Sequence, residues 1–382
     1  MLNKGNQLLT LFLVSLYLEI MVSLFFIFTQ DLTEWKPVLI HILIVIVLEN
    51  IVFWSGMLKI YFYSVQLGIK WRVIGILCGW IPIVHIWALY KIIGITKKEV
   101  EFEKEKYMTN IVRAEDAVCQ TKYPILLVHG VFFRDSTLLN YWGRIPGHLK
   151  KNGAYIYYGG HESAASIEES GKELAQKIKK IINETGCEKV NIIAHSKGGL
   201  DCRYAISCTD VEKNIASLTT ISTPHNGCLF ADYLLEKISP KIQNSVAKKY
   251  NAAAKKLGDK NPDFMEAVKS LTSKSCSEVN EKVLDVETVF YQSFGSKMNR
   301  ASSGKFPLNM IYPFVKHFDS ENDGLVAVAS MKWGKEFKLI KTTGGRGISH
   351  SDIIDLNREN IPGFDIREFY TEIVHDLKLR GL

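Results

Sequence analysis

The stretch Lys189-Val-Asn-Ile-Ile-Ala-His-Ser-Lys-Gly-Gly-Leu200 predicts a buried strand, a sharp turn and a helix that leaves the turn. The β-branched residues that open it are typical of a parallel strand covered on both faces. Ser196 has a small residue two positions before it, Ala194, and another two positions after it, Gly198. This spacing indicates a nucleophile elbow, where a strained backbone presents a serine hydroxyl and larger neighbouring side chains would collide. Ser196 is therefore the candidate nucleophile.

A small-x-Ser-x-Gly string also occurs in purely structural turns, and here Ala194 stands where glycine is more common. A second predicted strand, Tyr123-Pro-Ile-Leu-Leu-Val-His-Gly130, supports the catalytic interpretation. An oxyanion hole takes one backbone N–H from the residue after the nucleophile and one from a loop after a neighbouring strand. Lys197 and Val131 are the candidates for these two N–H groups. The alternative is that His129-Gly130 is only a turn from strand to loop.

The first hundred residues are much more apolar than the rest of the chain. Residues 8–28 and 38–58 are long enough to span a bilayer, and residues 73–90 form a shorter segment that contains glycine and proline. We therefore expect an all-α transmembrane region at residues 1–95 with two or three helices, three being favoured. Residues 96–119 alternate Lys and Glu and are expected to form a linker or a connecting helix.

The loops between these segments differ in charge. Residues 29–37 carry one base and two acids, whereas residues 59–72 carry three bases and no acid. The positive-inside rule then puts the C-terminal domain outside the cytoplasm if there are three spans, and inside if there are two. We expect a multi-pass cell-membrane protein with an extracytoplasmic catalytic domain. Glu19 and Glu49 lie within the apolar segments with no basic partner apparent at matching depth, and we expect them to face the helix bundle or a partner chain.

The composition of the 382 residues excludes several functional classes. A net charge of +7 is scattered among acids, so it favours attraction to an anionic membrane surface and indicates no nucleic-acid partner. The seven cysteines form neither a CxxC pair nor a Cys/His cluster at zinc spacing, and they indicate no disulfide framework.

Alternating strands and helices predict an α/β domain at residues 120–382, with a mostly parallel sheet flanked by helices. Further strands are expected at residues 154–158, 217–222, 289–294 and 336–340, and helices at 166–184 and 366–379. Helical patterns interrupt the alternation at about residues 229–286. An insertion at this point is consistent with a lid over the site. It is equally consistent with helices that pack against the domain and have no gating role.

A catalytic serine needs a histidine base and a carboxylate, which in this fold follow in the order serine, acid, histidine. Asp323 lies in a turn before an apolar run, and His350 lies in a glycine-rich loop directly after the last strand. These are the candidate acid and base. The alternatives for the acid are Asp319 and Glu321, and those for the base are His225, His317 and His375.

From residue 120 to the C-terminus the sequence resembles bacterial secreted lipases of the α/β-hydrolase superfamily. The shared motifs, in order, are Val128-His-Gly130, Ala194-His-Ser-Lys-Gly-Gly199, Ser222-Thr-Pro-His-Asn-Gly227, Asn322-Asp-Gly-Leu-Val326 and Ile348-Ser-His-Ser-Asp352. The resemblance implies an α/β-hydrolase fold and a triad of Ser196, Asp323 and His350. It also implies no required cofactor, although many members bind a structural calcium ion near the catalytic histidine. Asp352 matches one calcium ligand, and no second carboxylate can be assigned.

The resemblance, the apolar segments and the helical insertion together suggest a membrane-anchored serine hydrolase of carboxylic esters. The expected substrates are acylglycerols or other lipid esters, cleaved through an acyl-enzyme on Ser196. A short-chain esterase, a thioesterase or an acyltransferase would use the same triad. A membrane-binding protein that keeps the fold without chemistry is the alternative from another class.

Overall fold

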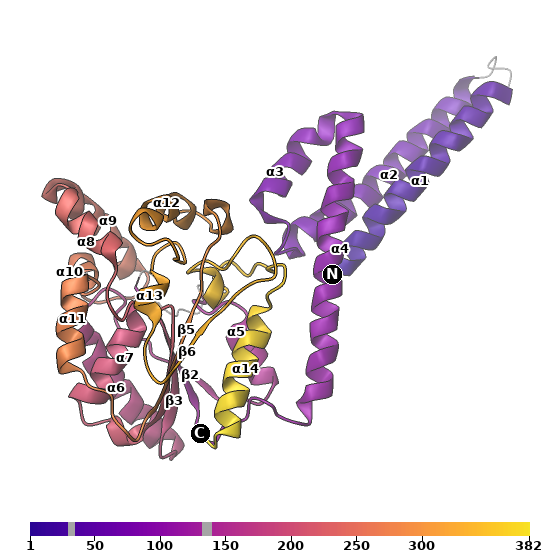
Figure 1. Cartoon of the computed structure of the whole chain (residues 1–382). Coiled ribbons are helices and arrows are strands. Elements are labelled where there is room, and N and C mark those ends of the chain that lie inside the picture. Colours follow the sequence, from indigo (N-terminus) through magenta and orange to yellow (C-terminus); the bar gives the residue numbers. More distant parts are fainter. Residues whose placement is uncertain (30–34, 132–139) are drawn as a thin grey trace. The chain divides into compact units, whose positions relative to one another are not determined.

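The computed structural model describes residues 1–29, 35–131 and 140–382, and the chain divides into two units, residues 1–112 and 113–382 (Figure 1). The boundary between the units falls within helix α4 (Pro82–Ala114). The expected linker is therefore helical over most of its length.

Two helices of the first unit, α1 (Leu2–Thr29) and α2 (Trp35–Tyr63), are long and apolar enough to cross a membrane. Their apolar side chains are mostly exposed, which suits lipid better than water. The two helices approach closely because Gly56 has no side chain: a Cβ there would lie 2.7 Å from the Leu9 side chain.

The third apolar segment is not one continuous helix. It consists of α3 (Gly68–Leu77), a 3₁₀ turn η1 (Cys78–Trp80) and the start of α4. At ten residues, α3 is too short to span a bilayer. Pro82 begins α4 because its ring fixes φ and it lacks the N–H that a continuing helix would need. Within the described residues, the structure thus has two candidate spans rather than the favoured three.

Glu19 has a basic partner after all. Its carboxylate lies 3.3 Å from Nε2 of His41 on the neighbouring helix. The expectation that no such partner lies at matching depth is therefore wrong for Glu19. One carboxylate oxygen of Glu49 is buried within the unit.

The second unit is built on a six-stranded, fully parallel sheet in the order β2-β1-β3-β4-β5-β6. This arrangement confirms the expected fold class. The strands are β1 (Ile125–Val128), β2 (Ile156–Tyr158), β3 (Val190–His195), β4 (Ile215–Ile221), β5 (Phe290–Gly295) and β6 (Glu336–Leu339). The central strand β3 is buried along its whole length, as its apolar run predicts.

Helices cover both faces of the sheet (Figure 1). One face packs against α5 (Ile145–Lys151) and α14 (Ile366–Leu379), and the other against α6 (Ile167–Thr185) and α7 (Lys197–Cys208). Successive strand residues alternate between the two cores, so that Leu127 belongs to the first and Val128 to the second. Because the strands are parallel, their carboxyl ends meet at one edge, where the predicted site residues follow them.

The helical insertion comprises α8 (Leu229–Lys237), α9 (Pro240–Lys256), α10 (Phe264–Lys269) and α11 (Ser273–Lys282). Cys276 of α11 is fully buried in a cluster with Ile167 and Leu200, so α11 is part of the core. The sequence did not predict three further helices: α5, α12 (Leu308–Phe318) and α13 (Val328–Met331). Short 3₁₀ helices lie at Glu212–Asn214, Ala301–Ser303 and Asp352–Ile354.

A paired guanidinium and carboxylate join α5 to the loop after β6. Arg144 donates from Nε and from its main-chain N–H to one oxygen of Asp355, at 2.8 and 2.7 Å, and from Nη2 to the other oxygen at 2.8 Å. The Asp355 side chain is only 1% exposed. Removing the guanidinium would leave a buried carboxylate without its counter-charge, which is costly.

We predict that Arg144→Ala lowers the free energy of unfolding by about 3 kcal/mol. Arg380→Ala is the control, because Arg380 pairs with Glu336 and Asp376 at the exposed surface and should contribute less than about 1 kcal/mol. Both values can be measured by chemical denaturation of the detergent-solubilised protein. Equal stability of the two variants would contradict the prediction.

Candidate active site

Ser196 occupies the turn between β3 and α7 with φ 55° and ψ −133°. This conformation is unfavourable for any residue with a side chain, and it persists because the flanking strand and helix fix the backbone on both sides. Ser196 is the N-cap of α7, so the N–H of Lys197 belongs to the first turn of the helix, where N–H groups lack a helical acceptor. The predicted nucleophile and one predicted oxyanion donor are therefore adjacent at the sheet edge.

Two glycines allow the neighbouring turn to approach Ser196. A Cβ on Gly198 would lie 2.3 Å from the carbonyl oxygen of His129, and a Cβ on Gly130 would lie 2.7 Å from the Cβ of Ser196. Both distances are far below van der Waals contact, so the close approach depends on the missing side chains. Val131, the second predicted oxyanion donor, directly follows this contact and is buried.

Asp323 and His350 are joined by two hydrogen bonds. Nδ1 of His350 lies 2.7 Å from Oδ2 of Asp323, and the backbone N–H of His350 donates to the Asp323 carbonyl at 2.9 Å. The other carboxylate oxygen accepts the N–H groups of Val326 at 2.8 Å and Leu325 at 3.1 Å. A carboxylate held by these donors accepts a hydrogen bond from the N–H at Nδ1, and this tautomer leaves the lone pair of Nε2 available.

His195 connects the serine turn to the base. Its ring centre lies 4.4 Å from that of His350, so the loop after β6 reaches the end of β3. Burial, and then the neighbouring His350, hold the pKa of His195 well below its usual range. His195 is therefore neutral, and its Nδ1 can accept a hydrogen bond.

Tyr141, which sequence reasoning missed, supplies that hydrogen bond. Its hydroxyl lies 2.6 Å from Nδ1 of His195 and accepts the N–H of Gly130 at 3.0 Å. One buried hydroxyl thus links the oxyanion turn to the strand that carries Ser196. No sequence motif marks Tyr141, because the link joins three separate segments.

The side chain of Lys197 lies in the protein interior below the turn. Its Nζ is 2.6 Å from Oδ1 of Asp201 and 3.2 Å from Oγ of Ser170, and both charged side chains are 1% exposed. Nε2 of His161 lies 3.5 Å from the other oxygen of Asp201, and the His161 ring stacks on that of His129 at 4.1 Å. Burial raises the pKa of Asp201 to about 6, while Lys197 acts in the opposite direction. The 2.6 Å distance between Nζ and Oδ1 identifies the two side chains as a buried ion pair.

Two of the alternative bases, His225 and His375, have other partners. His225 stacks on Trp333 and lies 3.0 Å from the hydroxyl of Thr220, and burial holds its pKa well below the usual range. Nδ1 of His375 lies 3.0 Å from the Val118 carbonyl. The remaining alternatives lie on or just after α12: His317, Asp319 and Glu321.

Asp352 does not lie in an arrangement that fits calcium. Its carboxylate faces the guanidinium of Arg346 at 3.2 and 3.3 Å and accepts the N–H of Ser349 at 3.1 Å. Calcium takes six to eight oxygen ligands. Within residues 1–29, 35–131 and 140–382, no group of three or more His, Cys, Asp or Glu side chains is arranged to hold a metal ion.

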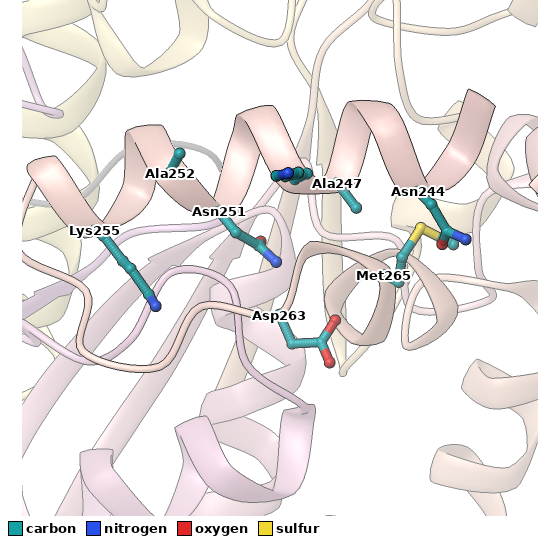
Figure 2. Close-up of a pocket in the computed structure, with 8 residues that line it drawn as sticks. Asn244, Ala247, Asn251, Ala252, Lys255, Asp263 and Met265 are labelled. Carbon is teal, nitrogen blue, oxygen red and sulfur yellow. The ribbon is translucent and has the colours of Figure 1, made fainter. Parts of the chain in front are cut away.

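A hollow of about 600 Å³ lies on the insertion, between α9 and the turn before α10 (Figure 2). Its lining is Asn244, Ala247, Lys248, Asn251, Ala252, Lys255, Asp263 and Met265. None of the candidate catalytic residues contributes to this lining, and much of it is polar. It is therefore not the site of ester chemistry.

Comparisons with known proteins are consistent with this geometry. The family described as palmitoyl protein thioesterase matches residues 124–278. Triacylglycerol lipase of Burkholderia plantarii is 37% identical over 126 residues, which cover 32% of this chain and 35% of that protein. Triacylglycerol lipase 2 of Saccharomyces cerevisiae is 30% identical over 264 residues, or 64% of this chain and 74% of the yeast protein. The chain thus spans about a third of the bacterial relative's length and about three quarters of the yeast relative's.

A solved structure shares the fold. The metagenomic carboxyl esterase superposes with a TM-score of 0.53 at 15% identity, over 68% of this chain and 76% of that one. At this identity the likeness concerns the fold alone. It agrees with the parallel sheet and flanking helices described above.

We predict that Lys197→Met and Asp201→Asn each destabilise the protein by about 3 kcal/mol, because each leaves the other member of a buried ion pair without its partner. The double variant should lose clearly less than the sum of the two, since no uncompensated charge remains. Denaturation of the three variants and the wild type measures this coupling. Additive losses would contradict the assignment of Lys197 and Asp201 as a pair.

Proposed function

The chain belongs to the triacylglycerol lipase family, and we propose that it is a serine hydrolase that cleaves carboxylic esters through an acyl-enzyme on Ser196. The observation that carries the proposal is the buried, doubly hydrogen-bonded pair of Asp323 and His350. The ring of His350 lies beside that of His195, the residue directly before the strained Ser196 turn. Structural turns alone do not require an acid and a base in this order.

In the proposed first step, Nε2 of His350 removes the proton from the Ser196 hydroxyl as its oxygen attacks the ester carbonyl. Asp323 holds the imidazole in the tautomer that leaves Nε2 free and stabilises the imidazolium that forms. The N–H groups of Val131 and Lys197 donate to the oxyanion. The new proton on His350 then passes to the leaving alcohol.

Water releases the acyl group in the second step. His350 takes a proton from the water, the resulting hydroxide attacks the acyl carbonyl, and the same two N–H groups stabilise the second oxyanion. The proton returns to the Ser196 oxygen as the acid leaves. No metal ion or cofactor takes part in either step.

The proposed substrates are esters of lipids, including acylglycerols. Support comes from the names of the relatives, which are triacylglycerol lipases, and from the apolar helices of the first unit. A thioester of a long acyl chain is a second candidate because the palmitoyl protein thioesterase family matches residues 124–278. That match contains Gly130 and Ser196 but ends before Asp323 and His350. It therefore supports the assignment of the nucleophile, and it gives less support to a thioester over an ester as the substrate.

We further propose that α1 and α2 anchor the protein in the cell membrane as a pair of spans. Two spans return the chain to the side on which it began, and the basic residues at 59–72 favour the cytoplasmic side for the catalytic unit. The acidic residues of the first loop lie at positions 30–34, outside the described residues. This proposal replaces the extracytoplasmic location, which depended on a third span.

Ser196→Ala, Asp323→Asn and His350→Ala should each lower kcat for ester hydrolysis by about 10⁴-fold or more, because each removes a member of one catalytic unit. His317→Ala is the matched control, since this exposed histidine lies on α12 and should leave kcat unchanged. Hydrolysis of glycerol esters of increasing chain length, and of an acyl thioester, measures both rate and preference. A fluorophosphonate probe should react with wild type and not with Ser196→Ala. Full activity of Ser196→Ala, or a wild type that does not react with the probe, would refute the serine mechanism.

A membrane-impermeant maleimide should label Cys208 only after the membrane is opened, because the thiol is exposed on the proposed cytoplasmic unit. Cys208→Ser identifies that signal, since it removes this thiol and leaves the other six cysteines in place. If intact cells were labelled and Cys208→Ser abolished that labelling, the catalytic unit would lie outside the cytoplasm.

A further inference from the structure

One positive side chain lies among the acids of the loop that carries His350. Nη2 of Arg346 is 3.2 and 3.3 Å from the two carboxylate oxygens of Asp352 and 3.1 Å from an oxygen of Glu359. Nζ of Lys305 holds the other oxygen of Glu359 at 2.6 Å. A single nitrogen therefore faces three carboxylate oxygens from two acids.

Asp352 is part of the local structure around His350. Its carboxylate accepts the N–H of Ser349, and its own N–H lies 3.2 Å from the Ser349 hydroxyl and 3.0 Å from the Ser349 carbonyl. These contacts close a turn in which His350 is enclosed. The Asp352 side chain is 2% exposed, so its negative charge requires compensation within the protein.

The main chain of Arg346 is fixed to a different segment. Its carbonyl accepts the N–H of Asn299 at 3.2 Å and the hydroxyl of Ser303. Two residues further on, the N–H of Ile348 donates to the Lys297 carbonyl at 2.8 Å. Arg346 thus joins the segment after β5, through its backbone, to the turn around His350, through its guanidinium.

The resemblance to secreted lipases implies a calcium ion bound by Asp352, and the observed contacts of Asp352 do not fit one. The guanidinium already supplies one positive charge at the Asp352 carboxylate. We propose that Arg346 is a built-in cation that positions the loop of His350, so that this loop requires no divalent metal ion. Arg346 is a positioning residue: it contacts Asp352 and Glu359, and acts on the chemistry only through His350.

Replacing Arg346 with alanine would leave the Asp352 carboxylate without its counter-charge and the Glu359 carboxylate paired with Lys305 alone. Such a pair of oxygen-donating acids is the type of group that attracts calcium. Arg346→Ala should therefore gain a response to calcium that the wild type lacks. Arg346→Lys keeps the charge and should keep most of the stability.

The experiment compares full-length wild type, Arg346→Ala, Arg346→Lys and the surface control Arg380→Ala in detergent, each with EDTA and with millimolar calcium. The midpoint of thermal unfolding, Tm, is measured for all, together with kcat and KM on a soluble short-chain ester. In EDTA, Arg346→Ala should have a lower Tm and about a tenfold or greater loss of kcat with little change in KM, because a displaced base mainly affects the chemical step. Calcium should restore part of both losses, whereas wild type and Arg380→Ala should not respond.

Three results would overturn the inference. The first is a wild type whose Tm falls in EDTA and recovers with calcium, since this would indicate a metal site. The second is an Arg346→Ala variant that matches Arg380→Ala in EDTA, and the third is a loss that calcium leaves unchanged. If Arg346→Ala does not fold, the Tm of wild type with and without calcium, and that of Arg346→Lys, still decide the question.

The kinetic readout rests on the proposed ester hydrolysis, whereas Tm does not. If no variant, including the wild type, hydrolysed an ester, the proposed function would fail. The dependence of Tm on residue 346 and on calcium would still test the role of Arg346.

Discussion

The strained turn at Ser196 is the constraint on which the catalytic unit depends. A residue with a side chain occupies φ 55° there. It lies between a fully buried strand whose residues belong to both cores and a helix that packs in one of them, so neither element can shift without disturbing a core. The turn also requires the chain around Gly130 to approach within contact of the serine. The rigid parallel sheet thus supplies the position of the nucleophile and of both proposed oxyanion donors.

Polar groups below and beside the turn hold it without being exposed to the substrate. Lys197 directs its charge inward to Asp201 and leaves only its N–H at the turn. Tyr141 joins the Gly130 N–H to a neutral His195. Buried polar groups are costly unless each finds a partner, so these contacts fix one arrangement of the turn at the expense of alternatives.

The sequence was sufficient to predict the sheet, the flanking helices α6, α7 and α14, and the pairing of Asp323 with His350, because these follow from local periodicity and from motifs at strand ends. It did not predict Tyr141, Asp201 or Arg346. Tyr141 contacts a segment distant in sequence, whereas Asp201 and Arg346 pair with Lys197 and Asp352 in their own segments. No motif marks any of the three, because an isolated tyrosine, aspartate or arginine carries no local signal. Hydropathy does not predict the break of the third apolar segment at residues 78–81, because hydropathy averages over a segment whereas the break arises from backbone geometry at glycine and proline.

The three members of the proposed triad are held by different kinds of interaction. Ser196 is positioned by the sheet, and Asp323 by the N–H groups of its own turn. His350 lies in a loop rich in glycine, which loses more conformational freedom on ordering than other residues do. Backbone hydrogen bonds from Ile348 to Lys297 and from His350 to Asp323 order this loop. Charged contacts, from Arg346 to Asp352 and from Arg144 to Asp355, hold the segment that follows the base. Of the three residues, the base is thus the one that charged contacts outside the triad support.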